Sequence, residues 1–223
     1  MNVLAIGAHP DDVELGCGGI LALLKKKGHK IYILVLTKGE ASGDPLVREK
    51  ECYLSAEILK ADKLFFGNLK DTKITDGIET IAEIEKVVKI TQPEIVFSHG
   101  TKDRHQDHRN AGMATLSASR HCHKVLLYES PDALRNFCPQ VFVDVSSSFE
   151  VKLKALEAFS SQISKVFFRG NQHNSFTSLS GIPYISNAVE GLARYRGFQA
   201  SLLLAEAFEV GKFIWDVKSN GML

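Results

Sequence analysis

The stretch that decides the fold is Val3-Leu4-Ala5-Ile6-Gly7-Ala8, followed by a glycine-rich turn and then by a second apolar run, Ile31-Tyr32-Ile33-Leu34-Val35-Leu36. Continuous apolar runs of this length are typical of strands that are covered on both faces. Between the two runs, an apolar stretch leads into Lys25-Lys26-Lys27-Gly28. Cations followed by a glycine are favoured at helix C-termini. The segment therefore predicts a strand, a helix and a second strand.

The same alternation continues along the chain. Further strand patterns lie at 63–66, 94–98, 124–128 and 141–145, and helical patterns lie at 47–59, 78–90, 149–161 and 184–200. Strands that alternate with helices predict βαβ units. We expect an α/β fold with a Rossmann-like, mostly parallel sheet in a three-layer α/β/α arrangement. We expect one domain over 1–223, whose part from about 147 adds helices and a site-wall loop. The segment 169–183, rich in Gly, Asn and Ser, is expected to be a surface loop or flap.

Composition excludes several classes of protein. The 223 residues include 27 basic and 26 acidic side chains, a formal charge of +1. This balance argues against nucleic acid or an anionic membrane as a partner, because both bind to clustered positive charge. No apolar run approaches the roughly 18 residues that span a bilayer, and the N-terminus lacks signal-peptide features. The four cysteines form no CxxC pair, so we expect reduced thiols and a cytoplasmic protein.

The histidines indicate where chemistry takes place. Five of the eight lie between positions 99 and 123, and a sixth, His9, follows the first predicted strand. Ligands of open α/β sheets bind outside the carboxyl ends of the strands. We therefore expect the functional residues in the segments 7–16, 37–48, 67–76 and 98–110.

The first of these segments contains a histidine and two consecutive aspartates. Pro10 restricts His9 to extended geometry. Consecutive carboxylates cannot point the same way from an extended loop, so Asp11 and Asp12 can divide two roles, metal binding and contact with substrate or water. Histidine with carboxylate suits Zn²⁺ or Fe²⁺. The structural alternative is that the aspartates cap a helix and His9 only packs at a strand end.

The fourth segment contains His105 and His108, whose spacing puts both on one side of a helical turn. The pattern is not HExxH, so a zincin protease is excluded. If this loop faces the first, then His9, Asp12 and one of the two histidines supply two nitrogens and an oxygen. Catalytic zinc commonly has three such ligands and an open position for water.

Three motifs together carry a family resemblance: AHPDDVELGCGG at 8–19, TKGEASG at 37–43 and KDRHQDH at 102–108. They resemble the zinc-dependent N-acetylglucosaminyl de-N-acetylases, the PIG-L or LmbE-like family. The likeness is greatest to the bacterial branch that deacetylates small N-acetylglucosamine glycosides in thiol-cofactor biosynthesis, and it extends to Ala205-Glu206-Ala207-Phe208. The resemblance implies a hydrolase that removes N-acetyl from such a sugar, with Zn²⁺, or Fe²⁺ or another divalent metal. It also implies a homo-oligomer, either a trimer or a hexamer.

The resemblance further implies roles for individual residues. His9, Asp12 and His108 would bind the metal, which polarises the amide carbonyl and lowers the pKa of the attacking water towards roughly 7. Asp11 would be the general base. A protonated His105, held by Asp107, would stabilise the oxyanion. Whether Asp11 or His105 protonates the leaving amine stays open.

Two residues match family positions that contact substrate, namely Arg48 and Asp71. The structural alternatives are an exposed helical arginine and a turn-forming aspartate. Glu206, in an apolar context, is expected to have a structural role at the wall of the site.

Other functions compete with this interpretation. The turn Gly16-Cys17-Gly18-Gly19-Ile20-Leu21 has a leucine where a dinucleotide-binding GxGxxG motif has its third glycine. The chain also has no GxSxG elbow of a serine hydrolase. Two alternatives stay open: an amidase or deacylase for another small N-acyl compound, and a non-catalytic metal- or nucleotide-binding domain.

Overall fold

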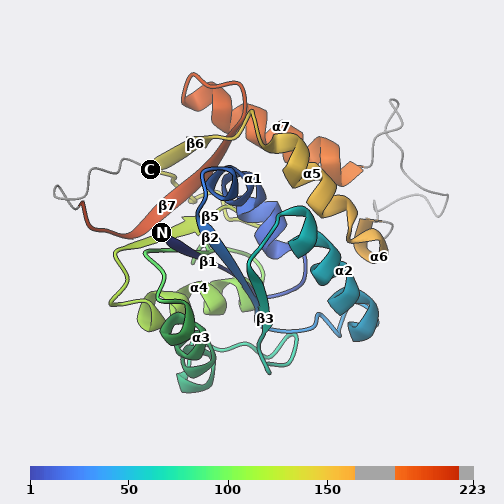
Figure 1. Cartoon of the computed structure of the whole chain (residues 1–223), viewed down its shortest axis with the longest axis vertical. Coiled ribbons are helices and arrows are strands. Elements are labelled where there is room, and N and C mark those ends of the chain that lie inside the picture. Colours follow the sequence, from blue (N-terminus) through green and yellow to red (C-terminus); the bar gives the residue numbers. More distant parts are fainter. Residues whose placement is uncertain (164–183, 216–223) are drawn as a thin grey trace.

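The computed structural model describes residues 1–163 and 184–215. Its strands form one sheet in the order β3-β2-β1-β4-β5-β7-β6 (Figure 1). The five strands β1 to β5 are parallel, and β7 runs antiparallel between β5 and β6. The strand bounds are β1 Asn2–Gly7, β2 Lys30–Val35, β3 Lys63–Phe66, β4 Ile95–His99, β5 Lys124–Tyr128, β6 Val141–Asp144 and β7 Ala205–Phe213.

Helices cover both faces of the sheet (Figure 1). Val3 and Ala5 of β1 face a core shared with α1 (Asp12–Lys26), α2 (Pro45–Ile58) and α5 (Phe149–Glu157). Leu4 and Ile6, which point to the opposite face, pack with α3 (Ile78–Thr91) and α4 (Gln106–Ala118). The predicted three-layer, mostly parallel α/β fold is confirmed.

The C-terminal part of the chain extends one of these layers. The predicted helix at 149–161 is divided into α5 and a short α6 (Ser160–Ile163), and α7 spans Tyr184–Gln199. A smaller apolar core joins α5 and α7 to β6 and the segment before β7, through Val145, Phe149, Leu156, Val189, Ala193 and Leu204. The predicted loop at 169–183 lies outside the described residues.

The pattern of apolar residues does not predict β7. Glu206 and Glu209 lie on this strand and both are buried. Each carboxylate accepts hydrogen bonds that compensate for the loss of water. Charged residues inside a short apolar run weaken the sequence signal of a strand. Among the described residues, no helix is long and apolar enough to cross a membrane.

Helix α1 begins directly after β1 and is broken near its start. Asp11 precedes it in the left-handed region, at φ 90°, and Asp12 is its first residue. Cys17 has φ −145° and ψ 16°, which are not helical values and mark a kink. The first turn of α1 therefore has its own direction, distinct from that of the rest of the helix.

Candidate metal centre

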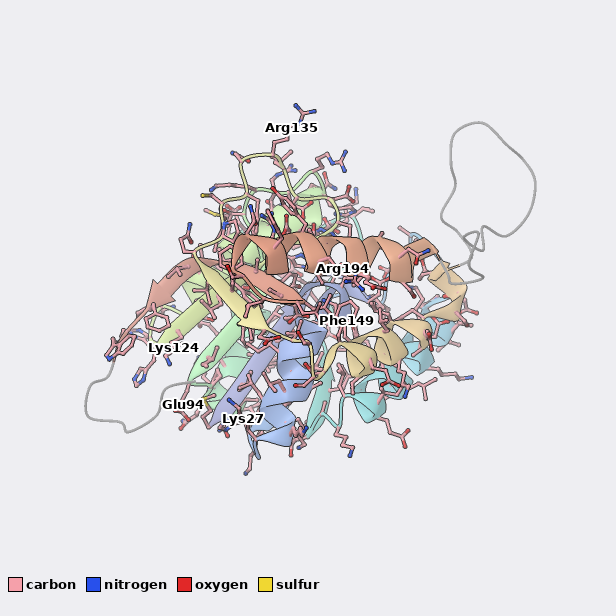
Figure 2. The ribbon with its side chains drawn as sticks, turned by 90° about the horizontal axis from the view of Figure 1, so that it is seen from above. Lys27, Glu94, Lys124, Arg135, Phe149 and Arg194 are labelled. Carbon is pink, nitrogen blue, oxygen red and sulfur yellow. The ribbon has the colours of Figure 1, made fainter. Side chains whose placement is uncertain are left out.

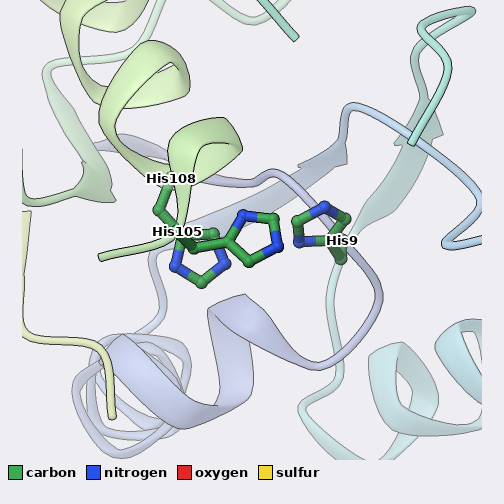
Figure 3. A group of neighbouring side chains, drawn as sticks. All are labelled: His9, His105 and His108. Atoms are coloured by element: carbon green, nitrogen blue, oxygen red, sulfur yellow. The ribbon is translucent and has the colours of Figure 1, made fainter. Parts of the chain in front are cut away.

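Three of the histidines converge at the carboxyl edge of the parallel strands (Figure 3). His9 comes from the turn between β1 and α1, and His105 and His108 come from the start of α4. The ring centroid of His105 lies 4.9 Å from that of His9 and 4.6 Å from that of His108. The loops after strands β1 and β4 therefore meet, as predicted from the sheet topology.

The Asp12 carboxylate lies at the centre of the cluster. Its Oδ2 is 3.4 Å from His9 Nδ1 and accepts a 2.7 Å hydrogen bond from the His9 backbone N–H. Its Oδ1 is 3.3 Å from His108 Nε2. The buried His99, at the end of β4, places Nε2 3.1 Å from Asp12 Oδ2. One buried carboxylate thus faces ring nitrogens of three histidines.

The outer nitrogens of two histidines face other carboxylates. His9 Nε2 lies 3.1 Å from Asp71 Oδ1 and 3.1 Å from Asp107 Oδ2. His108 Nδ1 lies 3.1 Å from Asp103 Oδ2. A carboxylate on the outer nitrogen fixes the orientation of a metal-binding histidine and raises its basicity. The inner nitrogens, His9 Nδ1 and His108 Nε2, are left directed at Asp12.

The electrostatics of the cluster favour positive charge. Burial opposes protonation of His9, but its hydrogen bonds to carboxylates, Asp107 first, raise its pKa to about 12. For His108, attraction to Asp12 and the bond to Asp103 outweigh burial and raise the pKa to about 10. The buried His99 has its pKa lowered to about 4, by burial and by His108. The carboxylates around His9 and His108 therefore favour positive charge at this place.

Overlapping sets of donors in the cluster could hold a divalent metal, and the expected ligands His9, Asp12 and His108 are divided between two of these sets. Three groups of side chains bring ligand atoms within 4.8 Å of one another: His9 with His105 and His108, Asp12 with His99 and His108, and His9 with Asp71 and Asp107. His9 and His108 each belong to two of these groups. Imidazole nitrogen with carboxylate oxygen suits Zn²⁺ and Fe²⁺.

Asp11 lies beside the cluster with a side chain that is 22% exposed. Burial, and then repulsion from Asp12, raise its pKa to about 8, although attraction to Arg48 opposes the shift. Its Oδ2 is 3.6 Å from Arg48 Nη2. A carboxylate with a pKa near neutrality can take up a proton during turnover.

The position of Arg48 contradicts the exposed-arginine alternative, because the residue is only 3% exposed. Its guanidinium donates to the Gly39 carbonyl at 2.9 Å, to the Pro10 carbonyl at 2.9 Å and to Ser42 Oγ at 2.5 Å. These contacts tie the loop after β2 to the turn that carries Asp11. The resemblance implies that this guanidinium contacts substrate. In the structure, most of its hydrogen bonds are made to other groups of the chain.

Asp71 also faces inward. Besides its contact with His9, its Oδ2 accepts a 3.0 Å hydrogen bond from the Ala41 backbone N–H. It lies after β3, so the loop that follows this strand meets the other two at the same edge. Asp71 therefore contacts His9 in the structure. The substrate contact that the resemblance implies for Asp71 stays a prediction.

The expected contact between the Asp107 carboxylate and the His105 ring is replaced by two others. His105 caps α4, and its Nδ1 accepts a 3.2 Å hydrogen bond from the Asp107 backbone N–H. The Asp107 carboxylate instead turns to His9 and to the Thr72 backbone N–H, 2.7 Å away. Burial, together with His108 and His9, lowers the pKa of His105. Because Nδ1 accepts the Asp107 N–H, a neutral His105 ring would carry its proton on Nε2.

Sequence reasoning missed Asp103, which orients His108. Its carboxylate also accepts a hydrogen bond from the Ser130 hydroxyl, and its Oδ1 accepts one from the His105 backbone N–H at 2.7 Å. The available signal was its position five residues before His108, in the loop that leads into α4.

The fold and the cluster together define a Rossmann-like α/β protein with a buried histidine–aspartate centre suited to a divalent metal. The family model described as "PIG-L: GlcNAc-PI de-N-acetylase" matches residues 4–119. The chain belongs to the PIG-L family, a family of hydrolytic de-N-acetylases.

The relatives of the chain include two proteins named as deacetylases and one named as a hydratase. The chain is 38% identical over 164 residues to the uncharacterized deacetylase YaiS of Escherichia coli (strain K12), a match that covers 70% of this chain and 89% of YaiS. It is 31% identical over 186 residues to a diacetylchitobiose deacetylase of Thermococcus kodakarensis, with 72% and 70% of the two chains covered. It is also 25% identical over 192 residues to a 4-oxalmesaconate hydratase of Pseudomonas putida, with 72% and 74% covered.

A solved structure has the same fold throughout. The conserved protein TT1542 from Thermus thermophilus superposes with a TM-score of 0.81 at 26% identity, and all of both chains is covered.

Proposed function

We propose that the protein is a metal-dependent de-N-acetylase that removes the acetyl group from an N-acetylglucosamine-type sugar or glycoside. The observation that carries the proposal is the Asp12 carboxylate with the inner nitrogens of His9 and His108 directed at it. Membership of the PIG-L family and the diacetylchitobiose deacetylase relative support the reaction and the substrate class.

In this proposal His9, Asp12 and His108 hold the metal, and Zn²⁺ is the ion that we favour, with Fe²⁺ or another divalent ion as the alternative. A bound divalent metal supplies Lewis acidity to the amide carbonyl and to the attacking water. Asp71, Asp103 and Asp107 keep the histidine rings in the orientation that binding requires.

Asp11 removes the proton from the attacking water. Its raised pKa keeps the proton affinity of the carboxylate high, and the positive charge of a bound cation would bring that pKa down towards neutrality. The turn that carries Asp11 is fixed by the bond from Arg48 to the Pro10 carbonyl. We therefore propose that Arg48 holds the base, Asp11, in place. Only the N–H groups of Arg48 that are not used within the chain could contact the sugar.

His105 stabilises the developing oxyanion as a neutral donor. Its Nδ1 is engaged by the Asp107 N–H, so Nε2 carries the proton and can donate it as a hydrogen bond. Asp107 then acts on His105 through its backbone and on His9 through its carboxylate. After attack, the proton held by Asp11 is available for the leaving amine, which makes Asp11 our preferred donor over His105.

The experiment measures the amine released from a panel of N-acetylglucosamine glycosides by fluorescamine. Metal-loaded wild-type protein should release amine. Asp11→Asn should keep stoichiometric metal and lose turnover by about 10²–10⁴-fold, the usual contribution of a general base. His108→Ala should lose much of the metal.

Other outcomes distinguish the competing functions. Full turnover by Asp11→Asn would remove Asp11 from its role as base. Silence of the loaded wild type across the panel would favour an amidase or deacylase that acts on another small N-acyl compound. Addition of water to an unsaturated acid without release of amine would favour the chemistry named for the hydratase relative.

The setting of the enzyme is also part of the proposal. We propose that residues 1–223 act as one cytoplasmic domain that assembles into a trimer or a hexamer. The exposed apolar side chains Phe213, Ile214 and Trp215 lie together at the end of β7, and such a patch supports self-association. Light scattering of the purified protein would test the assembly, and a monomer would contradict it.

A further inference from the structure

The kink in α1, at Cys17, lies beside backbone groups of the helix that form hydrogen bonds with side chains from other elements. In an unbroken helix, the N–H of residue i donates to the carbonyl of residue i−4, so Gly19 would donate to Leu15. Here the Gly19 N–H donates to Glu206 Oε1 at 2.8 Å, and the Leu15 carbonyl accepts from Lys152 Nζ at 2.8 Å. The backbone donor and the backbone acceptor of this helical pair therefore each contact a side chain from another element.

Those two side chains form an ion pair with each other. Lys152 Nζ lies 2.6 Å from Glu206 Oε1, and both side chains are only 3% exposed. The second carboxylate oxygen of Glu206 accepts a 2.8 Å hydrogen bond from the Ile20 N–H. Lys152 thus bonds to the part of α1 before the kink, and Glu206 bonds to the part after it. The two parts are linked by charge-assisted hydrogen bonds, which are stronger than neutral ones.

Close packing at the kink explains the glycines of this segment. A Cβ on Gly19 would lie 2.9 Å from Val145 Cβ and 3.0 Å from Glu206 Oε1. A Cβ on Gly18 would lie 3.3 Å from the Lys152 side chain. Helix α5, which starts near the labelled Phe149, lies against α1, which ends near the labelled Lys27 (Figure 2). The elements that carry the ion pair are therefore pressed onto the broken helix.

The part of α1 before the kink carries the chemistry. It begins at Asp12 and follows Asp11, whereas the part after the kink is the amphipathic body of the helix. We propose that Lys152 and Glu206 are positioning residues, which set the direction of the first turn of α1 and so place Asp12 and Asp11. This proposal rests on the proposed function, in which Asp12 binds the metal.

A buried ion pair would also be expected to matter for stability alone, because removal of one partner leaves an unpaired buried charge. The test must therefore measure the site and not only the fold. Co²⁺ is a suitable probe, since its affinity and its visible absorption spectrum both report the geometry of the ligands.

Lys152→Met should lower the affinity for Co²⁺ by about 10-fold or more, as loss of a supporting group around a metal does, and should alter the Co²⁺ spectrum. Lys152→Arg, which keeps the charge and the donors, should restore much of the affinity. Lys25→Met is the control. Lys25 lies in the last turn of the same helix and forms a 2.7 Å ion pair with Asp62, far from the kink along α1. Its Co²⁺ affinity should equal that of the wild type.

A lower melting temperature of Lys152→Met with unchanged Co²⁺ affinity and spectrum would overturn the positioning role. If Lys152→Met does not fold, the double variant Lys152→Met/Glu206→Gln removes both buried charges, and the same weakening of Co²⁺ binding is expected from it. A wild-type protein that binds Co²⁺ but releases no amine would remove the proposed function alone. A wild-type protein that binds no Co²⁺ would remove both.

Discussion

His9 and His108 each use both ring nitrogens, one toward Asp12 and the other toward a separate carboxylate. The outer carboxylate fixes the tautomer, so the inner nitrogen is left as the one that can bind a metal. Within residues 1–163 and 184–215, that outer partner is Asp103 alone for His108, whereas His9 has both Asp71 and Asp107. The site should therefore depend more on Asp103 than on either partner of His9.

Asp103→Asn should lower the metal affinity of the protein by about 10–100-fold, because the His108 ring loses its charged partner. Competition with a coloured chelator would measure the affinity. Asp132→Asn is a suitable control, since Asp132 pairs with the exposed Arg104 in the same region. Equal affinities for the Asp103 variant and the wild type would show that His108 is oriented by other contacts.

At the scale of the element, the start of α1 can pack closely against the sheet because Gly16 has no side chain. A Cβ on Gly16 would lie 2.1 Å from the buried Tyr128 ring. Tyr128 cannot give way easily, because its hydroxyl donates to the Ile6 carbonyl at 2.8 Å. The turn and β1 are thereby packed around one aromatic side chain.

Gly16→Ala should destabilise the protein by about 1–3 kcal/mol through overpacking, as measured by urea unfolding. Gly191→Ala is the matched change, because Gly191 lies in α7 with nothing within 4 Å of an added Cβ. That variant should be stabilised by roughly 0.5–1 kcal/mol, since alanine is the better helix former. Comparable losses in both variants would contradict a role for Tyr128.

The strands with continuous apolar runs could be predicted from the sequence, and β3 and β5 have the predicted bounds. The meeting of His9, His105 and His108 followed from the rule that strand ends share an edge. The partners of Arg48 and Asp107 could not be predicted, because they depend on a helix cap and on loops from other strands. The strand β7 was missed because its buried carboxylates are satisfied by residues far along the chain.

At the scale of the whole molecule, the formal charge is +1, while carboxylates are concentrated at one edge of the sheet. A neutral sugar needs no long-range field to reach such a site, because the relevant charge is local. A divalent cation, in contrast, would be held only by the folded chain, since its ligands come from loops after β1 and β4. Binding should then raise the stability of the entire protein.

Saturation with Zn²⁺ at about 100 times its dissociation constant should stabilise the fold by ~2.7 kcal/mol. For a chain of this size that corresponds to a rise in melting temperature of about 5–10 °C, which differential scanning calorimetry would detect. A chelator should reverse the rise, and His108→Ala should show little of it. An identical melting temperature with and without metal in the wild type would argue against a site that forms only on folding.

The antiparallel course of β7 has a consequence for the order in which the protein assembles. Glu206, near the end of the chain, completes the hydrogen bonds of Gly19 and Ile20, near its beginning. Contacts of such long sequence separation form late, because the entropy of closing the loop must be overcome first. A nascent chain on the ribosome therefore carries both aspartates long before it can orient them. In pulse-labelled hydrogen exchange during refolding, the amides of Gly19 and Ile20 should gain protection no earlier than those of β7.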